Sequence, residues 1–286
     1  MKVSVMTNLF SRKRNGEMIS TFESIEYCKE AGFNALDLSL TALFRNESEF
    51  NAENWRELAV ALREKADRLG VSFFQSHLPY GFSRVVYGVG EGEFLVEMTH
   101  RALEISSIAG VKWAVVHPVN CVGTSCEDTE AHLKANHQAY DQFVNKAKDL
   151  GIGIAFENMV DTKVRRFGSL ATELVALVDS FTCENVGVCW DFGHGALMYE
   201  NQTEGIRRVG KRLKAVHVAD NWGANDDHMP PFIGNNNWEE IMKVLREIGF
   251  DGNMVFEVKI NSNMPDELKV LSAVYCAKLG EYLISL

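Results

Sequence analysis

The architecture of this chain can be inferred from GIAFENM (residues 153–159), VGVCWDFGH (186–194) and AVHVADN (215–221). Each segment starts as a short apolar run and ends in polar residues, and a longer amphipathic stretch separates it from the next. The runs are nearly all apolar rather than alternating, which is typical of parallel strands covered on both faces. The three segments therefore predict consecutive strand–helix units.

The same pattern recurs along the whole chain, in about eight units spaced by roughly 30 to 40 residues. We expect strands at residues 3–8, 35–40, 71–77, 113–117, 153–157, 186–191, 215–220 and 253–258. We expect helices at residues 21–31, 52–69, 92–109, 127–150, 169–180, 202–212, 238–248 and 265–285. Gly70, Gly110, Gly151 and Gly249 are typical helix stops. The 286 residues thus predict a (β/α)8 TIM barrel of the α/β class, in one domain over residues 1–286.

A doubly wound open sheet is the alternative α/β architecture, and it usually carries a glycine-rich phosphate turn after its first strand. No such turn follows the first predicted strand here. The glycine-rich segment GVGEGEF (88–94) precedes a predicted helix but follows no strand, so it does not match a dinucleotide-binding motif. We interpret it as a flexible loop over the mouth of the barrel.

The composition is that of a soluble globular protein, with 46% hydrophobic and 24% charged residues. The formal net charge of −10 argues against a nucleic-acid partner, since such proteins usually present a basic face. No apolar run has the length of a signal-peptide core or a membrane span, so we expect a cytoplasmic protein without a membrane partner. The cysteines lack CxxC spacing and are expected to be reduced thiols; they are Cys28, Cys121, Cys126, Cys183, Cys189 and Cys276.

Four hard-ligand side chains occupy the carboxyl ends of different predicted strands, namely Glu157, Asp191, His217 and Glu257. The carboxyl ends of barrel strands meet at one face, where the active sites of TIM barrels lie. Three carboxylates and an imidazole buried together are costly unless a cation neutralises them. The sequence therefore predicts a site for one divalent metal ion (Mn, Zn, Mg or Co), with a metal-free polar network as the alternative.

Further residues near the same strand ends are candidates for substrate binding. They are His77 in SHLPYG, His117 in VVHPVN, His194, Trp222, His228 and Lys259. The alternative role of His194 is a cap or loop packing, and that of Lys259 is an ion pair with an acidic neighbour. Aromatic residues can stack on a sugar or fill the core. We expect core packing for Trp113 and substrate contact for Trp222.

The succession HLPYG, HPVN, FENM, WDFGH, VHVAD, DDHMPPFIG and FEV resembles the sugar isomerase and epimerase superfamily of barrels, which includes xylose isomerase-like proteins, ketose 3-epimerases and hydroxypyruvate isomerases. The likeness covers nearly the whole chain and is strongest over residues 154–257. The resemblance implies that Glu157, Asp191, His217 and Glu257 hold the metal, and that the two glutamates also transfer protons. The loop IGNNNW (233–238) departs from the family's IGEG pattern, which makes its substrate contacts hard to carry over.

These features predict a metal-dependent isomerase or epimerase that acts on a sugar, a sugar phosphate or a keto acid. A divalent ion that chelates two neighbouring oxygens stabilises an enediolate, while one carboxylate removes a proton and a second returns it. Barrels of this kind commonly form homo-oligomers.

Three other functions stay open. A zinc-dependent phosphodiesterase similar to apurinic-site endonucleases would use further ligands, which this chain offers as His77, His117, His194, Asp226 and His228. The acidic net charge and the sequence of the seventh loop weigh against it. A dehydratase on the same barrel and a binding protein without catalysis are the other two.

Overall fold

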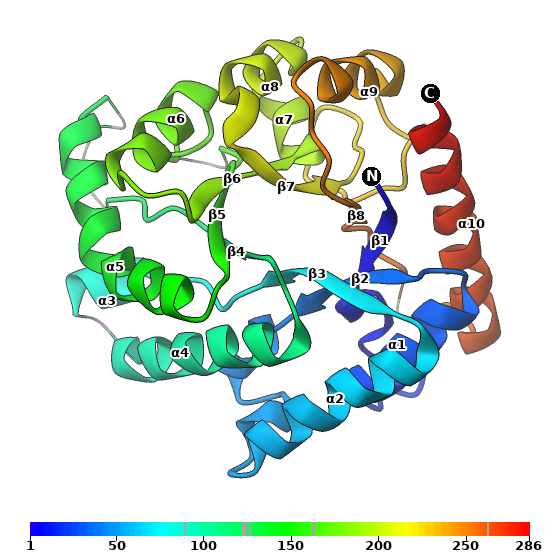
Figure 1. Cartoon of the computed structure of the whole chain (residues 1–286). Coiled ribbons are helices and arrows are strands. Elements are labelled where there is room, and N and C mark those ends of the chain that lie inside the picture. Colours follow the sequence, from blue (N-terminus) through cyan, green and yellow to red (C-terminus); the bar gives the residue numbers. More distant parts are fainter. Residues whose placement is uncertain (89, 122–124, 126, 162–163, 262) are drawn as a thin grey trace.

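Eight parallel strands close into a barrel, and helices surround it on all sides (Figure 1). This architecture is that of a computed structural model, which describes residues 1–88, 90–121, 125, 127–161, 164–261 and 263–286. The strands follow one another in chain order, and β1 pairs with β8 to close the sheet. The predicted (β/α)8 TIM barrel is confirmed.

The strands are short, and each contributes three to six residues to the barrel. They are β1 (Val3–Met6), β2 (Ala35–Ser39), β3 (Ser72–His77), β4 (Trp113–Val116), β5 (Gly153–Glu157), β6 (Val186–Asp191), β7 (Leu213–Val218) and β8 (Met254–Phe256). The predicted bounds of β5 and β6 are correct at both ends. The other strands stop or start one or two residues from the predicted positions, so His117, Asp220 and Glu257 lie just beyond the ladder.

The helices follow the strands in the predicted order. They are α1 (Thr21–Glu30), α2 (Trp55–Leu69), α3 (Ser83–Tyr87), α4 (Gly92–Ala109), α5 (Thr129–Asp149), α6 (Ala171–Ser180), α7 (Phe192–Met198), α8 (Thr203–Val209), α9 (Trp238–Glu247) and α10 (Asp266–Ser285). Short 3-10 helices lie at η1 (Thr7–Phe10), η2 (Thr41–Arg45), η3 (Glu49–Asn51) and η4 (Gly210–Arg212). Gly70 and Gly110 end α2 and α4 in the left-handed conformation, at φ +66° and +85°, as their positions predicted.

The sequence pattern did not predict α3 and α7. Each has at most seven residues, which is too short for a period of 3.6 residues to show. The predicted helix 202–212 is also divided, since α8 ends at Val209 and the chain continues as η4. The glycine-rich segment 88–94 partly lies outside the described residues, and its second half opens α4.

The core has two parts because barrel strands present alternate side chains to opposite faces. The outward side chains pack against the helices, and fully buried members of this layer include Phe156 and Trp190. The inward side chains include a small cluster of Val115, Ala155, Cys189 and Ala215. Trp113 packs against this cluster from the start of β4, as predicted for a core residue. Phe156 and Trp190 are likewise core residues.

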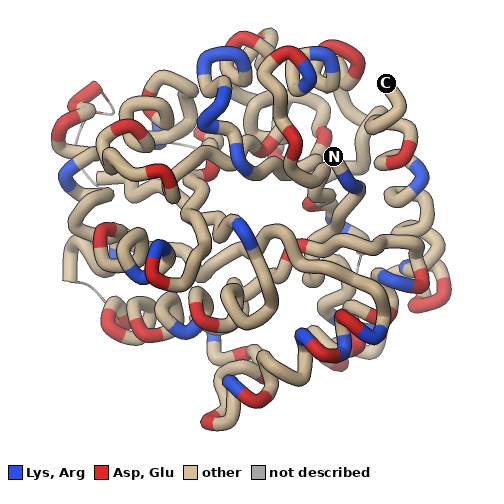
Figure 2. The backbone as a smooth tube through the Cα atoms, viewed as in Figure 1, with Lys and Arg blue, Asp and Glu red and all other residues tan. Residues whose placement is uncertain are grey.

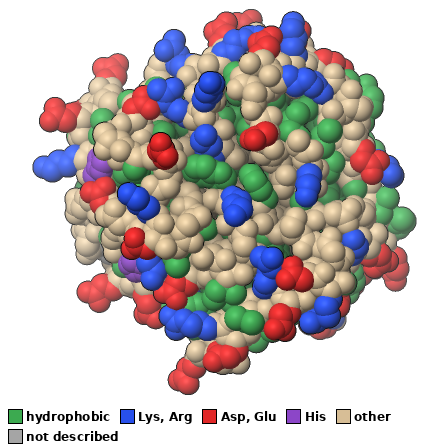
Figure 3. All heavy atoms as spheres, viewed as in Figure 1, with side chains coloured by type: hydrophobic (Ala, Val, Ile, Leu, Met, Phe, Trp, Pro, Cys, Tyr) green, Lys and Arg blue, Asp and Glu red, His purple; other side chains and the backbone are tan. Residues whose placement is uncertain are grey.

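Charged residues of both signs are distributed along the ring of helices (Figure 2). In the face shown in Figure 3, Lys and Arg side chains are scattered among acidic and apolar ones, and histidine atoms appear only toward the edge. Within the described part of the chain, no helix combines the length and the apolar character that crossing a membrane requires. The described cysteines, Cys28, Cys121, Cys183, Cys189 and Cys276, are free thiols, whereas Cys126 lies outside the described residues.

Candidate metal centre and active site

Four predicted ligands converge at the carboxyl ends of β5 to β8. Glu157 and Asp191 are the last residues of β5 and β6, His217 is the second last of β7, and Glu257 directly follows β8. One ligand atom from each lies within 4.8 Å of the corresponding atoms of the other three. His217 Nδ1 is at the centre of this group, 2.8 Å from Glu157 Oε1, 2.9 Å from Glu257 Oε2 and 4.0 Å from Asp191 Oδ2.

The two carboxylate oxygens of Asp191 differ in their hydrogen-bond partners. Oδ1 accepts a hydrogen bond of 2.7 Å from the backbone N–H of His194, which caps the first turn of α7. Oδ2 is buried, faces His217, and has no hydrogen-bond partner in the described part of the chain. A buried carboxylate oxygen without a partner is costly, and a cation at this point would satisfy it. The residues present therefore fit a metal ion.

The electrostatics of the cluster favour a cation as well. Burial alone disfavours the charged form of Glu157, but His217, His117 and His77 hold its pKa well below the usual range. Burial also opposes the charge on Glu257, and His217 nevertheless lowers its pKa to about 2. For Asp191 burial prevails and raises the pKa to about 6. The donors are thus carboxylate oxygens and one imidazole nitrogen, a set that suits Zn²⁺ or Mn²⁺.

His77 and His117 form a second group with the other oxygen of Glu157. His77 Nε2 lies 3.3 Å and His117 Nε2 3.0 Å from Glu157 Oε2. His77 Nδ1 is 3.0 Å from the carbonyl oxygen of Leu78, so a ring protonated on both nitrogens donates to Leu78 and to Glu157. The His117 ring stacks on Tyr80, with 5.0 Å between ring centroids. Glu157 is therefore shared by both groups.

His194, Asp226 and His228 form a third group at the edge of the cluster. Asp226 Oδ2 lies 3.5 Å from His194 Nε2 and 3.0 Å from His228 Nε2. Burial disfavours protonation of both rings, but Asp191 and Asp226 raise the pKa of His194 to about 10, and Asp226 raises that of His228 to about 9. The side chain of His194 also pairs with the carbonyl oxygen of Asn158 at 2.7 Å. Of the two alternatives predicted for His194, a cap or loop packing, the cap involves only its backbone N–H.

Trp222 and Lys259 lie farther out. Trp222 is 56% exposed in the loop after β7, and its carbonyl oxygen accepts a hydrogen bond from Asn235. Lys259 is exposed, and its ammonium has no carboxylate within ion-pair distance among the described residues. The prediction that Lys259 shares a face with Glu257 depended on strand alternation, and β8 ends before both residues. Both remain predicted substrate contacts.

The unusual IGNNNW segment has a structural role. Asp220, just after β7, accepts hydrogen bonds from Trp238 Nε1 (2.9 Å) and from the backbone N–H groups of Phe232 and Asn236 (both 3.1 Å). The Asn236 amide donates to the carbonyl oxygens of Phe192 and Ala219. The asparagine thus links the loop after β7 to the start of α7, next to Asp191.

Sequence reasoning missed Asp37, in the middle of β2. Its side chain is fully buried, and its Oδ2 lies 4.0 Å from His217 Nε2. The only signal in the sequence was a single acidic residue between two leucines in the apolar run ALDLS. Asp37 shares the inward face of β2 with Ala35, since residues two apart on a strand lie on one side.

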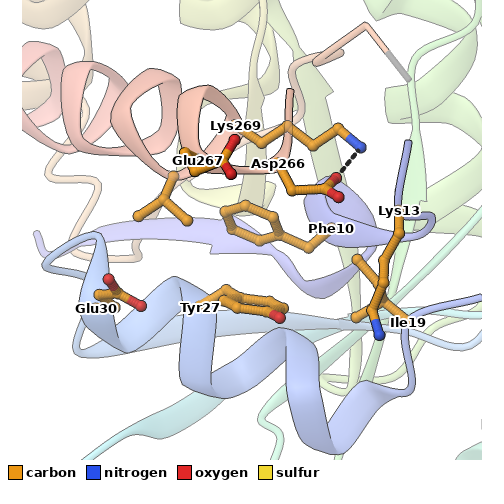
Figure 4. Close-up of a pocket in the computed structure, with 9 residues that line it drawn as sticks. Phe10, Lys13, Ile19, Tyr27, Glu30, Asp266, Glu267 and Lys269 are labelled. Carbon is orange, nitrogen blue, oxygen red and sulfur yellow. Dashed lines mark hydrogen bonds and ion pairs between the residues drawn. The ribbon is translucent and has the colours of Figure 1, made fainter. Parts of the chain in front are cut away.

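Of two cavities in the structure, one adjoins the candidate site and the other does not. A cavity of about 140 Å³ opens beside His117 and is also lined by Tyr80, Asn120 and Arg166. A second cavity, of about 260 Å³, lies between α1 and α10, where Phe10 and Tyr27 form an aromatic wall (Figure 4). Its buried ammonium, Lys269, is paired with Asp266 at 2.8 Å. None of the predicted ligands lines this second cavity, so the first is the one adjoining the candidate site.

Comparisons with known proteins identify the family and the fold. The family model for xylose isomerase-like TIM barrels matches residues 25–274. An uncharacterised protein of Methanocaldococcus jannaschii is 30% identical over 176 residues, covering 61% of this chain and 59% of its own. The ketose 3-epimerase of Arthrobacter globiformis is 24% identical over 149 residues, covering 51% and 49%. The matches span less than two thirds of the length of these curated relatives.

Solved structures share the fold over the whole chain. A D-tagatose 3-epimerase-like protein superposes with a TM-score of 0.77 at 23% identity, covering 100% of this chain and 98% of its own. The IOLI protein, solved with a zinc atom bound, superposes with a TM-score of 0.79 at 18% identity, with coverages of 100% and 98%. At these identities the likeness establishes the barrel fold.

Proposed function

This chain belongs to the xylose isomerase-like TIM barrel family, and from that premise we propose that it is a divalent-metal-dependent isomerase or epimerase of a sugar or sugar-derived compound. The observation that supports the proposal most is the convergence of Glu157, Asp191, His217 and Glu257 within 4.8 Å. Named relatives with this fold include ketose 3-epimerases. Glu157, Asp191, His217 and Glu257 would hold the ion.

The proposed chemistry assigns the proton transfers to the two glutamates. A bound divalent ion would polarise the substrate carbonyl and stabilise negative charge on its oxygen. Glu157 and Glu257 reach the His217 ring from strands at different positions in the barrel, with 2.8 Å and 2.9 Å to the same nitrogen. Their lowered pKa values keep both carboxylates ionised, which is the form that can accept a proton. One glutamate removes the proton next to the carbonyl, and the other returns one.

Several residues are proposed to orient the substrate. His117 lines the cavity of about 140 Å³ beside the ligand cluster. Its Nε2–H is directed at Glu157, so its Nδ1 can accept a hydrogen bond from a substrate hydroxyl. His77, His194 and His228 present ring nitrogens around the same cluster. The exposed Trp222 and Lys259 would contact the outer part of the substrate. A cytoplasmic location and a homo-oligomer remain predictions.

The decisive experiment measures metal content and then proton exchange. The purified protein is analysed for bound metals and incubated in D2O with a panel of ketoses, keto acids and their phosphates. Incorporation of deuterium into one compound, together with loss of the activity on chelation, is the expected result. Exchange that is unaffected by chelation, or metal-loaded protein that exchanges no proton in any compound, would contradict the proposal. Loss of a β-hydroxyl would identify a dehydratase instead.

A zinc-dependent phosphodiesterase is the second candidate because of two further groups of ligands. His77 and His117 share Glu157 with the first group, and Asp226 lies between His194 and His228. Such an arrangement can hold more than one ion, as two-metal phosphodiesterases do. Metal stoichiometry separates the candidates. One ion per chain supports the sugar enzyme, whereas three zinc ions per chain with cleavage of an abasic-site oligonucleotide support the phosphodiesterase.

A further inference from the structure

The barrel interior contains buried polar atoms without hydrogen-bond partners. In the described part of the chain these include Ser4 Oγ, both oxygens of Asp37, both polar atoms of the Gln75 amide, and Nε2 of His217. All four side chains are at most 1% exposed. Gln75 precedes His77 by two residues on β3, and Asp37 pairs with Gln75 across the sheet. The four residues thus lie just inside the ligand cluster, on the inward faces of β1, β2, β3 and β7.

Buried polar groups are normally paired, so a concentration of unpaired ones calls for an explanation. Among these groups an unpaired carboxylate destabilises the folded state most, because burial disfavours its charge. Asp37 is not among the side chains whose ligand atoms converge within 4.8 Å, and no Lys or Arg of the described residues forms an ion pair with it. The polar groups against its carboxylate are the Gln75 amide and His217 Nε2, the latter at 4.0 Å from Oδ2.

The two nitrogens of His217 face opposite directions. Nδ1 faces Glu157 and Glu257, at 2.8 Å and 2.9 Å, and Nε2 faces Asp37. A neutral imidazole carries one N–H and one lone pair, so Nδ1 can bind a metal only if the proton resides on Nε2. The tautomer of a metal-bound histidine is set by the acceptor of its other nitrogen, usually a carboxylate or a carbonyl.

We propose that Asp37 is the positioning residue of His217: its carboxylate accepts the Nε2–H hydrogen bond that directs the Nδ1 lone pair at the metal. This inference rests on the proposed metal site. The separation of 4.0 Å is about 1 Å longer than a hydrogen bond, so the proposal requires the ring and the carboxylate to move about that much closer. Cys189 also lies against the ring, and a thiol is a weak acceptor.

The test compares the metal affinity of Asp37→Asn with that of the wild type. Apo proteins are titrated with Co²⁺, and the visible absorption of the bound ion gives Kd. Because loss of a partner of a ligating histidine typically weakens metal binding 10- to 100-fold, we expect a loss of about that size in Asp37→Asn. Ser4→Ala removes a neighbouring unpaired group, and Cys189→Ala removes the thiol. Both are expected to retain the wild-type Kd.

Two further readouts distinguish positioning from a merely structural role. The urea midpoint of apo Asp37→Asn should equal or exceed that of the wild type, because the substitution removes a buried charge. In the zinc-loaded wild type, long-range ¹H–¹⁵N correlation should find the proton of His217 on Nε2. Wild-type Co²⁺ affinity in Asp37→Asn, or a proton on Nδ1 in the loaded protein, would overturn this inference alone. Failure of the wild type to bind Co²⁺ would overturn the proposed metal site along with it.

Discussion

Glu157 and His217 are 60 residues apart in the sequence, yet Glu157 Oε1 lies 2.8 Å from His217 Nδ1 in the barrel. Both side chains are buried. Burial disfavours the charge on each, but the surrounding carboxylates raise the pKa of His217 well above its usual value, and the histidines lower that of Glu157. In the metal-free protein the imidazolium therefore supplies the positive charge among the carboxylates. Metal binding has to displace the proton from Nδ1.

Divalent metal should stabilise the chain through this site. A ligand that binds only the native state at 100 times its Kd adds about 2.7 kcal/mol to the free energy of unfolding. We expect Co²⁺ or Mn²⁺ to raise the thermal midpoint of the chelator-treated wild type, and to leave that of Asp191→Asn almost unchanged, because Oδ2 of Asp191 is the unpaired ligand. The exposed Asp149→Asn is the control and should respond like the wild type.

Replacing either glutamate should separate proton exchange from isomerisation. In Glu257→Gln and in Glu157→Gln, turnover should fall by about 100- to 10,000-fold, the usual contribution of a positioned acid or base. If the two carboxylates work on opposite faces of the substrate, each variant still exchanges deuterium into the isomer served by its remaining glutamate. Mass spectrometry of substrate and product in D2O measures this. Equal residual exchange into both isomers in both variants would refute a division of labour.

If the protein is a sugar enzyme, replacing His117 should weaken substrate binding more than metal binding. It lines the cavity beside the cluster, and its ring is held between Tyr80 and Glu157. We expect His117→Gln to retain one metal ion per chain and to raise KM. Metal content by elemental analysis and steady-state kinetics provide the two readouts. A loss of one bound ion from a multi-metal wild type would instead indicate that His117 is a ligand, as in the phosphodiesterase candidate.

The ion pairs of Asp226 should make metal-free stability depend on pH in the alkaline range. The pKa values of His194 and His228, raised to about 10 and about 9, exceed the unfolded value near 6.5. Their contribution is therefore fully present below about pH 6.5 and is lost as the pH rises through 9 to 10. Asp226→Asn should lower the free energy of unfolding by on the order of 2 kcal/mol at pH 6, and by much less at pH 10.5.

Urea denaturation of both proteins in chelator at the two pH values measures this difference. The carboxyl of Asp226 has a lowered pKa, so it stays ionised throughout and does not add to the slope. A difference between wild type and Asp226→Asn that is independent of pH would show that the carboxylate acts without the two histidines.

Asp220 should stabilise the loop after β7 through its hydrogen bonds. Its carboxylate accepts from the indole of Trp238 and from backbone N–H groups, all buried or partly buried. Asp220→Ala leaves these donors unsatisfied, and we expect a destabilisation of about 3 kcal/mol. Urea denaturation with the exposed Asp251→Ala as control measures it. If both variants have the same stability, the hydrogen bonds of Asp220 do not hold the loop.

Much of the candidate site was predictable because strand ends carry chemistry in a parallel barrel. Glu157 and Asp191 end predicted strands whose bounds are correct, and the four predicted ligands do converge. The strand alternation expected to place Lys259 on the same face as Glu257 stops at Phe256, where β8 ends. The sequence did not predict Asp37 as part of the site, because the residues around it in the apolar strand give no indication of its partner.

The amino-acid sequence by itself determined the order of strands and helices, since apolar runs of strand length and amphipathic stretches depend only on neighbouring residues. It also determined which residues lie at the carboxyl ends of the strands. Only the closure of the barrel, with β1 paired to β8, decided that Asp37 on β2 lies behind His217 on β7. That contact crosses the barrel interior, so it depends on the register of every strand pair around the ring rather than on any local pattern.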